Sequence, residues 1–315
     1  MAEASPAARR VIVAGSSGLI GSALVEALRA DGVQVTRLVR RQAQAPDEVA
    51  WLLDAAPLDP SVLAGADAVV SLGGASIGRM PWTPHYRSTL MWSRLTPTRT
   101  LAAALRELGS DAPAFVSASA VGYYGSAPGV QLREDAAPGD TFLARLCAEW
   151  EAAALGAGTR TRIALLRTAP VIHADGVLSP LVTLTRLGVA GPIGRGTQVW
   201  PWISLDDEVA AIRHVIDEQI DGPVNLAGPA RATANDLGFA LAVRMNKPYV
   251  FRAPRWAMRL ALSREAADAV LLTDADVVPA VLEASGFRFR HNTVDEAITA
   301  AVPAHALSAA SSFSD

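Results

Sequence analysis

Short apolar runs alternate with amphipathic segments through roughly the first half of the chain. The run RVIVA at 10–14 is typical of a buried strand. The segment SALVEALRADG at 22–32 places its apolar residues on one helical face, and Gly32 ends the predicted helix. VQVTRLVRR at 33–41 predicts a second strand. These three elements together form one predicted βαβ unit.

The alternation of strands and helices continues beyond this first unit. Further strands are predicted at 67–74, 162–172 and 222–228, a strand that runs into a loop at 114–125, and further helices at 93–109, 141–158 and 204–219. Strands that alternate with helices form parallel sheets with helices on both faces. The sequence therefore predicts an α/β fold with a Rossmann-type, doubly wound parallel sheet and a smaller C-terminal substrate region.

The regular alternation of predicted strands and helices ends after about residue 173. The stretch 186–204 is rich in Gly, Pro and Trp. We expect a dinucleotide-binding domain, a smaller substrate-side domain and a small, polar, disordered tail. Their predicted bounds are 8–172 completed by 203–228 for the first, 173–202 and 229–302 for the second, and 303–315 for the tail.

The segment GSSGLIG at 15–21 joins the first predicted strand to the first predicted helix. Gly15 permits a tight turn, Gly18 lets the backbone approach a phosphate, and Gly21 lets the helix pack closely on the sheet. The helix N-terminus then offers free N–H groups to a pyrophosphate. The predicted contacts are Gly15, Ser16, Ser17, Gly18, Leu19, Ile20 and Gly21. A glycine-rich turn in an unrelated α/β protein is the alternative.

The end of the second strand bears on which dinucleotide is bound. An NAD site usually has an acid there for the ribose hydroxyls, whereas an NADP site has Arg for the 2′-phosphate. Here the strand ends in Arg40 and Arg41, and the next acid along the chain is Asp47. We therefore expect NADP(H), with NAD(H) the weaker ligand. The alternative is that both arginines are ordinary solvated side chains.

Composition excludes several other classes of function. The net charge is -3 and no basic run occurs, which argues against nucleic-acid binding. No segment reaches the ~18 consecutive apolar residues of a membrane span, and no signal peptide is evident, so we expect a cytoplasmic protein. The single cysteine, Cys147, is expected to be a small core residue. The five histidines are scattered and suggest no metal site.

Several motifs occur in an order that resembles one protein family. They are GSSGLIG, SLGGASIG (71–78), SR…TR (93–99), SASAVGYYG (117–125), CAEWEAAA (147–154), LLRTAPVI, GPIGRGTQ…WI…DD (191–207), GPVNLAGP (222–229) and SGFRFR (285–290). Together they resemble the atypical, extended-like branch of the short-chain dehydrogenase/reductases, and within it the nucleoside-diphosphate-sugar epimerase-like "epimerase family". The family usually has a His after the Trp-Ile pair, where this chain has Ser204.

The resemblance implies further cofactor contacts after three strands. Leu72, Gly73 and Gly74 would lie beside the adenine-side ribose and the pyrophosphate. Ser117 and Ala118 would pass under the nicotinamide, and Thr168, Ala169 and Val171 would flank its carboxamide.

Hydride transfer in this superfamily uses a Ser, a Tyr and a Lys four residues after the Tyr, which lowers the pKa of the phenol. Ser119 matches the Ser, but the helix reads TFLARLCAEWE over 141–151 and has neither Tyr nor Lys. The only lysine, Lys247, has Val243 four residues before it, so YxxxK is absent.

Two substitutes for the missing pair are considered. Tyr123 or Tyr124 would act as the acid, the alternative being a Tyr packed under the substrate loop. Arg145 would replace the lysine electrostatically, although a surface position is the simpler interpretation. We interpret Glu149 and Glu151 as packing or surface residues.

Substrate contacts are predicted for aromatic and cationic residues in segments with loop-like composition. They are Arg79, Trp82, Arg94, Trp200 and Trp202. Asp206 and Asp207 are predicted to cap the helix that follows them.

These observations favour an NADP(H)-dependent oxidoreductase or epimerase with an atypical active site, acting on a small carbonyl or sugar-like molecule. A non-catalytic NADP(H) sensor is the alternative that the missing YxxxK motivates. A strict nucleotide-sugar epimerase, which needs tightly held NAD, fits the arginines less well. We expect a small-molecule partner, neither nucleic acid nor membrane, and a monomer or homodimer.

Overall fold

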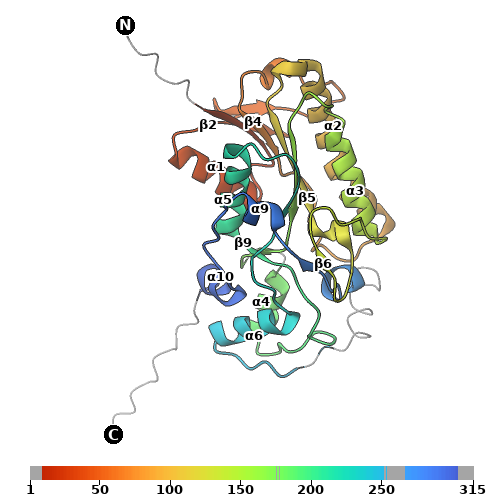
Figure 1. Ribbon diagram of the computed structural model, residues 1–315, viewed down its shortest axis with the longest axis vertical. Helices are drawn as coiled ribbons and strands as arrows, with labels where there is room; N and C mark the ends of the chain where they lie inside the picture. The colour runs from red at the N-terminus through yellow and green to blue at the C-terminus, as the bar shows by residue number, and fades with distance from the viewer. Residues whose placement is uncertain (1–8, 175, 177, 252, 254–266, 304–315) are drawn as a thin grey trace.

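A parallel seven-stranded sheet forms the centre of the protein in the computed structural model, which describes residues 9–174, 176, 178–251, 253 and 267–303 (Figure 1). The strand order is β10-β7-β5-β4-β1-β2-β3. Its strands are β1 (Arg10–Ala14), β2 (Gln34–Val39), β3 (Glu48–Ala50), β4 (Ala68–Ser71), β5 (Ala114–Ala120), β7 (Ile163–Thr168) and β10 (Gly222–Leu226). The order runs outward in both directions from the β1–β4 pair, which confirms the predicted doubly wound sheet.

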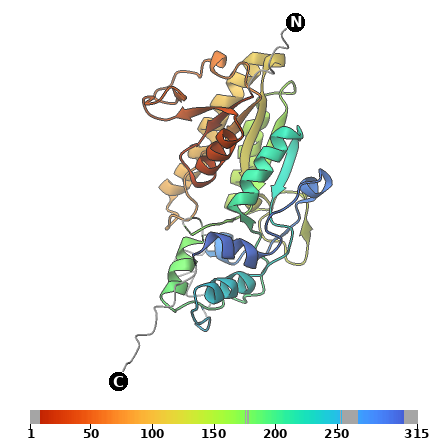
Figure 2. The same ribbon diagram turned by 90° about the vertical axis from the view of Figure 1, so that its left-hand side faces the viewer.

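Helices cover both faces of this sheet. α1 (Leu19–Ala30) and α5 (Leu205–Asp217) pack on one face, and α2 (Pro84–Leu108) and α3 (Phe142–Leu155) on the other (Figures 1 and 2). Successive strand residues point to opposite faces. In β1, accordingly, the even and odd positions of the apolar run belong to two separate buried clusters.

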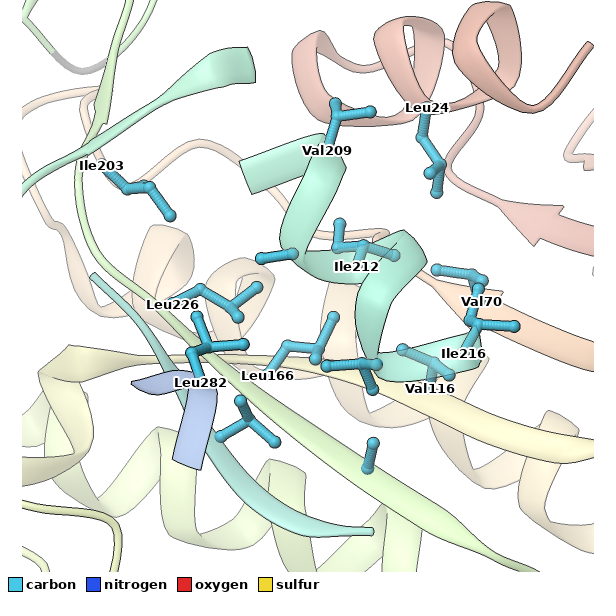
Figure 3. Packing of buried hydrophobic residues seen from close by; sticks show 14 of the residues in the cluster. Leu24, Val70, Val116, Leu166, Ile203, Val209, Ile212, Ile216, Leu226 and Leu282 are labelled. Carbon is cyan, nitrogen blue, oxygen red and sulfur yellow. The ribbon is translucent and has the colours of Figure 1, made fainter. Parts of the chain in front are cut away.

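The cluster under α1 and α5 is built from aliphatic side chains that point into one layer (Figure 3). Figure 3 labels Leu24, Val70, Val116, Leu166, Ile203, Val209, Ile212, Ile216, Leu226 and Leu282. α1 and α5 contribute residues at helical spacing, whereas the strands contribute residues at alternate positions. This layer packs both helices against one face of the sheet.

A smaller region follows the sheet and lies at one end of the molecule (Figure 1). There α4, α6 and α10 surround a second apolar cluster that contains Trp200 and Trp202. The remaining described elements are β6 (Gln131–Leu132), β8 (Val171–Ile172), β9 (Ile203–Ser204), β11 (Asp276–Val277), α4 (Ser179–Arg186), α6 (Ala234–Arg244), α9 (Ala280–Ala284), α10 (Val294–Ala301), the short turns η1 (Pro60–Val62), η2 (Gly109–Asp111) and η3 (Val121–Tyr124), and the π-turn η4 (Ala267–Leu271).

Two departures from the predicted elements have a clear local cause, and β3 is a strand that was not predicted. α2 begins at Pro84, well before 93, because Thr83 caps it by accepting a hydrogen bond from the Tyr86 amide. The strand predicted at 162–172 is interrupted at Pro170, which has no N–H to donate to the ladder, and continues as β8 paired with β9.

Two predictions about the extent of these regions remain open. The division into two domains stays a prediction, and residues 304–315 of the predicted tail lie outside the described residues. Among the residues that the structure describes, no helix has the length and apolar character needed to cross a membrane.

Candidate functional site

The turn between β1 and α1 lies where β1 and β4 end side by side. Gly15 has φ +85°, and a Cβ there would lie 2.9 Å from the Gly73 amide nitrogen. A Cβ on Gly21 would lie 2.2 Å from the Gly15 carbonyl oxygen. A side chain at Gly15 would therefore push apart the turns after β1 and β4, and one at Gly21 would push α1 away from the turn that precedes it. The first glycine of GSSGLIG permits the close approach of the two turns, and the third permits the close packing of α1 on its own turn.

The N-terminus of α1 is open to an anion. Gly18 is the N-cap, so no side chain caps the helix, and the first turn contains no acidic residue. The first amides of a helix have no intrahelical acceptor and carry a partial positive charge. This end of α1 therefore has the donors that a pyrophosphate requires.

A cleft of about 330 Å³ runs from this turn toward β2 and β3. It is lined by Ala14, Gly15, Ser16, Ser17, Arg37, Leu38, Val39, Arg40, Arg41, Glu48, Trp51, Ser71, Gly73, Ser93 and Pro97. The backbone turn forms one end, and charged side chains from β2, β3 and the loop between them form the other. Such a crevice at the carboxyl ends of parallel strands is where open α/β sheets bind ligands.

At the charged end of the cleft Arg37 and Arg41 pair with the acids Asp47 and Glu48, and Arg40 is outside these pairs. Arg37 binds Asp47 through two nitrogens, at 2.7 and 2.9 Å. Arg41 binds Glu48 in the same bidentate way, at 2.8 and 2.7 Å. The side chain of Arg40 is exposed and forms no ion pair or hydrogen bond with any described residue. Arg40 is therefore the guanidinium that can meet an incoming anion without breaking a pair.

The neighbouring cations lower the pKa of both acids. Hydrogen bonding from Arg41, and then from the Gln44 amide, lowers the pKa of Glu48 to about 2. Hydrogen bonding from Arg37 likewise lowers the pKa of Asp47 to about 2. Both carboxylates are therefore charged at neutral pH.

The predicted cofactor residues divide into two groups. Six of them line the cleft: Gly15, Ser16, Ser17, Arg40, Arg41 and Gly73. The other predicted contacts, Gly18, Leu19, Ile20, Gly21, Leu72, Gly74, Ser117, Ala118, Thr168, Ala169 and Val171, are outside its lining. Their contact with a cofactor stays a prediction.

Glu48 and Trp51 are among the residues of the cleft lining that were not predicted from the sequence. Glu48 follows Asp47 and is in β3, where it pairs in register with Arg37 of β2. Trp51 is buried directly after β3. The sequence feature that could have indicated β3 is the apolar run VAW, which follows Pro46-Asp47-Glu48. This run is too short for periodicity to distinguish a strand from a loop.

A buried polar network lies at the carboxyl end of β5, around the predicted catalytic residues. The Ser119 hydroxyl donates to Glu151 Oε1 at 2.7 Å, and Arg167 binds both carboxylate oxygens of Glu151 at 2.9 Å. Arg167 Nη1 also donates to the Tyr124 hydroxyl at 2.9 Å, which in turn donates to Asn225 Oδ1 at 2.6 Å. Glu151 is thus one half of a buried ion pair, in contrast to the packing or surface position predicted for it.

The two adjacent tyrosines have different surroundings. Tyr124 is buried, its hydroxyl has two protein partners, and burial raises its pKa. Tyr123 is partly exposed, and its hydroxyl makes no hydrogen bond with the described residues. The Arg167 guanidinium lies 3.6 Å from the centroid of the Tyr123 ring. Of the two predicted acids, Tyr123 is the one whose hydroxyl is free to meet a substrate.

The face of α3 that packs on η3 is apolar. A Cβ on Gly122 would lie 3.4 Å from the Leu143 Cβ and 3.9 Å from the Cys147 sulfur. Leu143 and Cys147 are four residues apart, the spacing that a YxxxK pair would need. Complete burial raises the pKa of the Cys147 thiol to about 12, consistent with the predicted core residue. Arg145 is exposed and donates to the Asp140 carbonyl oxygen.

The predicted substrate residues are mostly packed into the protein. Trp82, Trp200 and Trp202 are buried, because the Gly- and Pro-rich segments fold around apolar clusters. Arg94 donates to the Leu90 and Ala75 carbonyl oxygens, and Arg79 is exposed beside Tyr86. Substrate contact by these five residues stays a prediction. The three tryptophans among them are buried, so their rings do not form an exposed binding wall.

The start of α5 contains a carboxyl group that was not predicted as a site residue. Glu208 is completely buried, Thr168 donates to its Oε1 at 2.9 Å, and Oε2 has no partner among the described residues. Burial raises the pKa of Glu208 to about 8. The cap of α5 is Ser204, whose hydroxyl accepts from the Asp207 amide, so the predicted cap at Asp206 and Asp207 is wrong by two residues or more.

Comparison with known proteins identifies two family models along the chain. The NAD dependent epimerase/dehydratase family matches residues 11–227, and a domain of unknown function, DUF1731, matches residues 253–301. An epimerase family protein of Mycobacterium leprae is 42% identical over 302 residues, which cover 95% of this chain and 97% of that protein. The human epimerase family protein SDR39U1 is 30% identical over 285 residues, 89% and 95% of the two chains.

Solved structures give the same relationship. The crystal structure of human SDR39U1 with NADPH has a TM-score of 0.82 and 29% identity, covering 93% of this chain and 98% of that one. A nucleoside-diphosphate sugar epimerase of Corynebacterium glutamicum has a TM-score of 0.75 and 30% identity, covering 94% of this chain and 58% of that one. The predicted resemblance is confirmed: this chain belongs to the NAD dependent epimerase/dehydratase family.

Proposed function

We propose that this protein binds NADP(H) more tightly than NAD(H) and transfers hydride between the nucleotide and a small carbonyl or sugar-like substrate. One observation carries the proposal: the cleft joins the glycine turn that leads into the uncapped N-terminus of α1 to an arginine that has no acidic partner among the described residues. The NADPH in the structure of human SDR39U1 supports the same choice of nucleotide. When bound, the nucleotide would supply or accept the hydride.

The protein residues would position the two phosphate groups separately. The amides that begin α1 would hold the pyrophosphate, as the glycine contacts at Gly15 and Gly21 leave room for its approach. Arg40 would bind the 2′-phosphate with its planar, bidentate guanidinium. Because NAD(H) lacks this phosphate, Arg40 contributes to selectivity between the two nucleotides.

Replacement of Arg40 by Ala tests the choice of nucleotide. We expect the NADPH Kd to rise about tenfold, which corresponds to about 1.4 kcal/mol for the loss of one charge-assisted contact. The NADH Kd should stay within about twofold, since that ligand has no group for Arg40. Fluorescence titration with both nucleotides measures this, with Arg99→Ala, an exposed arginine on α2, as the control. No saturable binding of either nucleotide would refute the proposal.

Proton transfer would fall to Tyr123. Its hydroxyl has no hydrogen-bond partner among the described residues, and the Arg167 guanidinium lies against the face of its ring. Consumption of NADPH over a panel of aldehydes, ketones and sugars is the assay. Tyr123→Phe should abolish any turnover without changing NADPH affinity, while Tyr124→Phe should act mainly on stability.

A non-catalytic NADP(H) sensor is the second candidate. The apolar Leu143 and Cys147 on the face of α3 that meets η3 favour it, because neither can take part in proton transfer at neutral pH. This candidate predicts NADPH binding without turnover across the panel. Turnover that Tyr123→Phe removes would eliminate it.

A further inference from the structure

The carboxylate of Glu48 lies in the cleft among groups that favour an anion. It shares the lining with Arg40, Arg41 and the glycine turn. Its side chain is 2% exposed, and it is charged at neutral pH because its pKa is lowered to about 2. Arg41 and Arg37 pair with this carboxylate, so its effect on a 2′-phosphate depends on the arginines that it holds. Its position therefore bears directly on which nucleotide the cleft favours.

The surroundings of Glu48 determine which of two roles it can have. A carboxylate in an NAD site accepts hydrogen bonds from the ribose hydroxyls. Two carboxylate oxygens have about four lone-pair positions. Around Glu48 these face Arg41 Nη1 at 2.8 Å, Arg41 Nη2 at 2.7 Å, Arg37 Nη2 at 3.2 Å and the Gln44 amide at 2.8 Å. Three of these N–H groups are hydrogen-bonded to Glu48 and the Arg37 guanidinium lies against Oε1, so little of its acceptor capacity is left for a ribose hydroxyl.

The same contacts limit what Arg41 can offer to a phosphate. Arg41 turns both of its terminal nitrogens toward Glu48. Nη1 also donates to the Gln42 carbonyl oxygen at 2.9 Å. Bidentate recognition of a phosphate uses a pair of parallel N–H groups, and the pair formed by the two terminal nitrogens is occupied. Arg40 has no such restraint, although it lines the same cleft.

We propose that Glu48 is a specificity-determining residue that withholds Arg41 from the 2′-phosphate and so restrains the preference for NADP(H) over NAD(H). The inference rests on the proposed function, since it assumes that the charged end of the cleft binds the adenosine ribose. Its effect falls on NADP(H) alone. The protein should accordingly retain measurable affinity for NAD(H), with Arg40 as the main source of its preference.

Glu48→Gln is the test, because the amide keeps one oxygen to accept from the Gln44 backbone but loses the charge that holds Arg41. We expect the NADPH Kd to fall about tenfold, equivalent to about 1.4 kcal/mol, while the NADH Kd changes less than about twofold. Both are measured by fluorescence titration of the full-length protein. Partial unfolding raises both apparent Kd values by the same factor, so it leaves their ratio unchanged.

Two further variants separate this role from a general effect of charge. Asp217→Asn removes a carboxylate that holds Arg9, and neither residue lines the cleft, so it should change the NADPH-to-NADH ratio by less than about threefold. In an Arg41→Met background, Glu48→Gln should gain less than about threefold, because the withheld group is gone.

Several outcomes would overturn the inference. They are an unchanged ratio of the two Kd values in Glu48→Gln, an equal gain for NADH, or a tenfold gain that persists without Arg41. If Glu48→Gln fails to fold, Glu48→Asp replaces it, since a side chain shorter by one methylene cannot keep the bidentate contact with Arg41. Failure of the proposed function is distinct, since neither nucleotide would then bind the unmodified protein.

Discussion

Replacement of Glu151 by Leu should strongly destabilise the protein. Glu151 and Arg167 form a bidentate ion pair whose side chains are 7% and 4% exposed. Without the carboxylate, the guanidinium stays buried between β5 and α3 with one hydroxyl and one carbonyl oxygen as its hydrogen-bond acceptors. Removing one partner of a buried ion pair costs about 3–5 kcal/mol, because the remaining charge is uncompensated.

Urea unfolding followed by circular dichroism measures this loss. Glu149→Leu is the matched control, since Glu149 is an exposed residue of the same helix and the change in side chain is identical. We expect the control to shift the free energy of unfolding by less than about 0.5 kcal/mol. The m-value should stay constant, so that the shift in midpoint reports stability alone.

A double replacement distinguishes the charge from the loss of packing. In Glu151→Leu/Arg167→Met the unpaired charge is absent, so the double variant should be more stable than Glu151→Leu by about 1–3 kcal/mol. Some loss remains, because the Tyr124 hydroxyl and the Glu134 carbonyl oxygen lose a donor. A Glu151→Leu variant that loses less than about 1 kcal/mol, or a double variant no more stable than it, would refute this account of the network.

Two further changes test the glycine turn and the buried acid. Gly21→Ala places a Cβ 2.2 Å from the Gly15 carbonyl oxygen, so the NADPH Kd should rise at least about tenfold in a fluorescence titration. Gly78→Ala is the control, because its Cβ meets only one side-chain oxygen at 3.5 Å, and this variant should bind NADPH normally. Glu208 has a pKa raised from 4.5 to about 8 in the folded protein, so the stability it contributes is full below pH 4.5 and is lost as the pH rises to about 8. The free energy of unfolding of wild type relative to Glu208→Gln should therefore fall across this window by up to about 1.4 kcal/mol per pH unit, and a difference that does not vary with pH would contradict the assignment.

The sequence was sufficient for the parts of the fold that depend on local pattern. β1, the turn at 15–21 and α1 follow from an apolar run, glycine spacing and one helical face, and the structure has all three. Parallel strands joined by helices then left the doubly wound sheet as the expected arrangement. The alternation of side chains in β1 between two buried layers needed no information beyond the chain itself.

Residues that act through pairing across the fold were not predictable in this way. Distance along the chain suggested that no acid lies near Arg40 and Arg41, but the pairing of β3 with β2 brings Glu48 beside them. Glu151 and Arg167 are on a helix and a strand, and their ion pair depends on how that helix packs. Exposure of the tryptophans was inferred from Gly- and Pro-rich composition, which does not reveal the apolar clusters that cover them.

The packing of α3 narrows where proton transfer can occur. Leu143 and Cys147 occupy the face against η3, so a phenol and an ammonium group cannot act from this helix. Ser119 and Tyr124 are already bonded inside the protein. Of the predicted acids this leaves Tyr123, whose ring meets the charge of Arg167 and whose hydroxyl has no partner among the described residues. The comparison of Tyr123→Phe with the unmodified protein therefore decides between a reductase and a nucleotide sensor, because no other predicted acid can replace that hydroxyl.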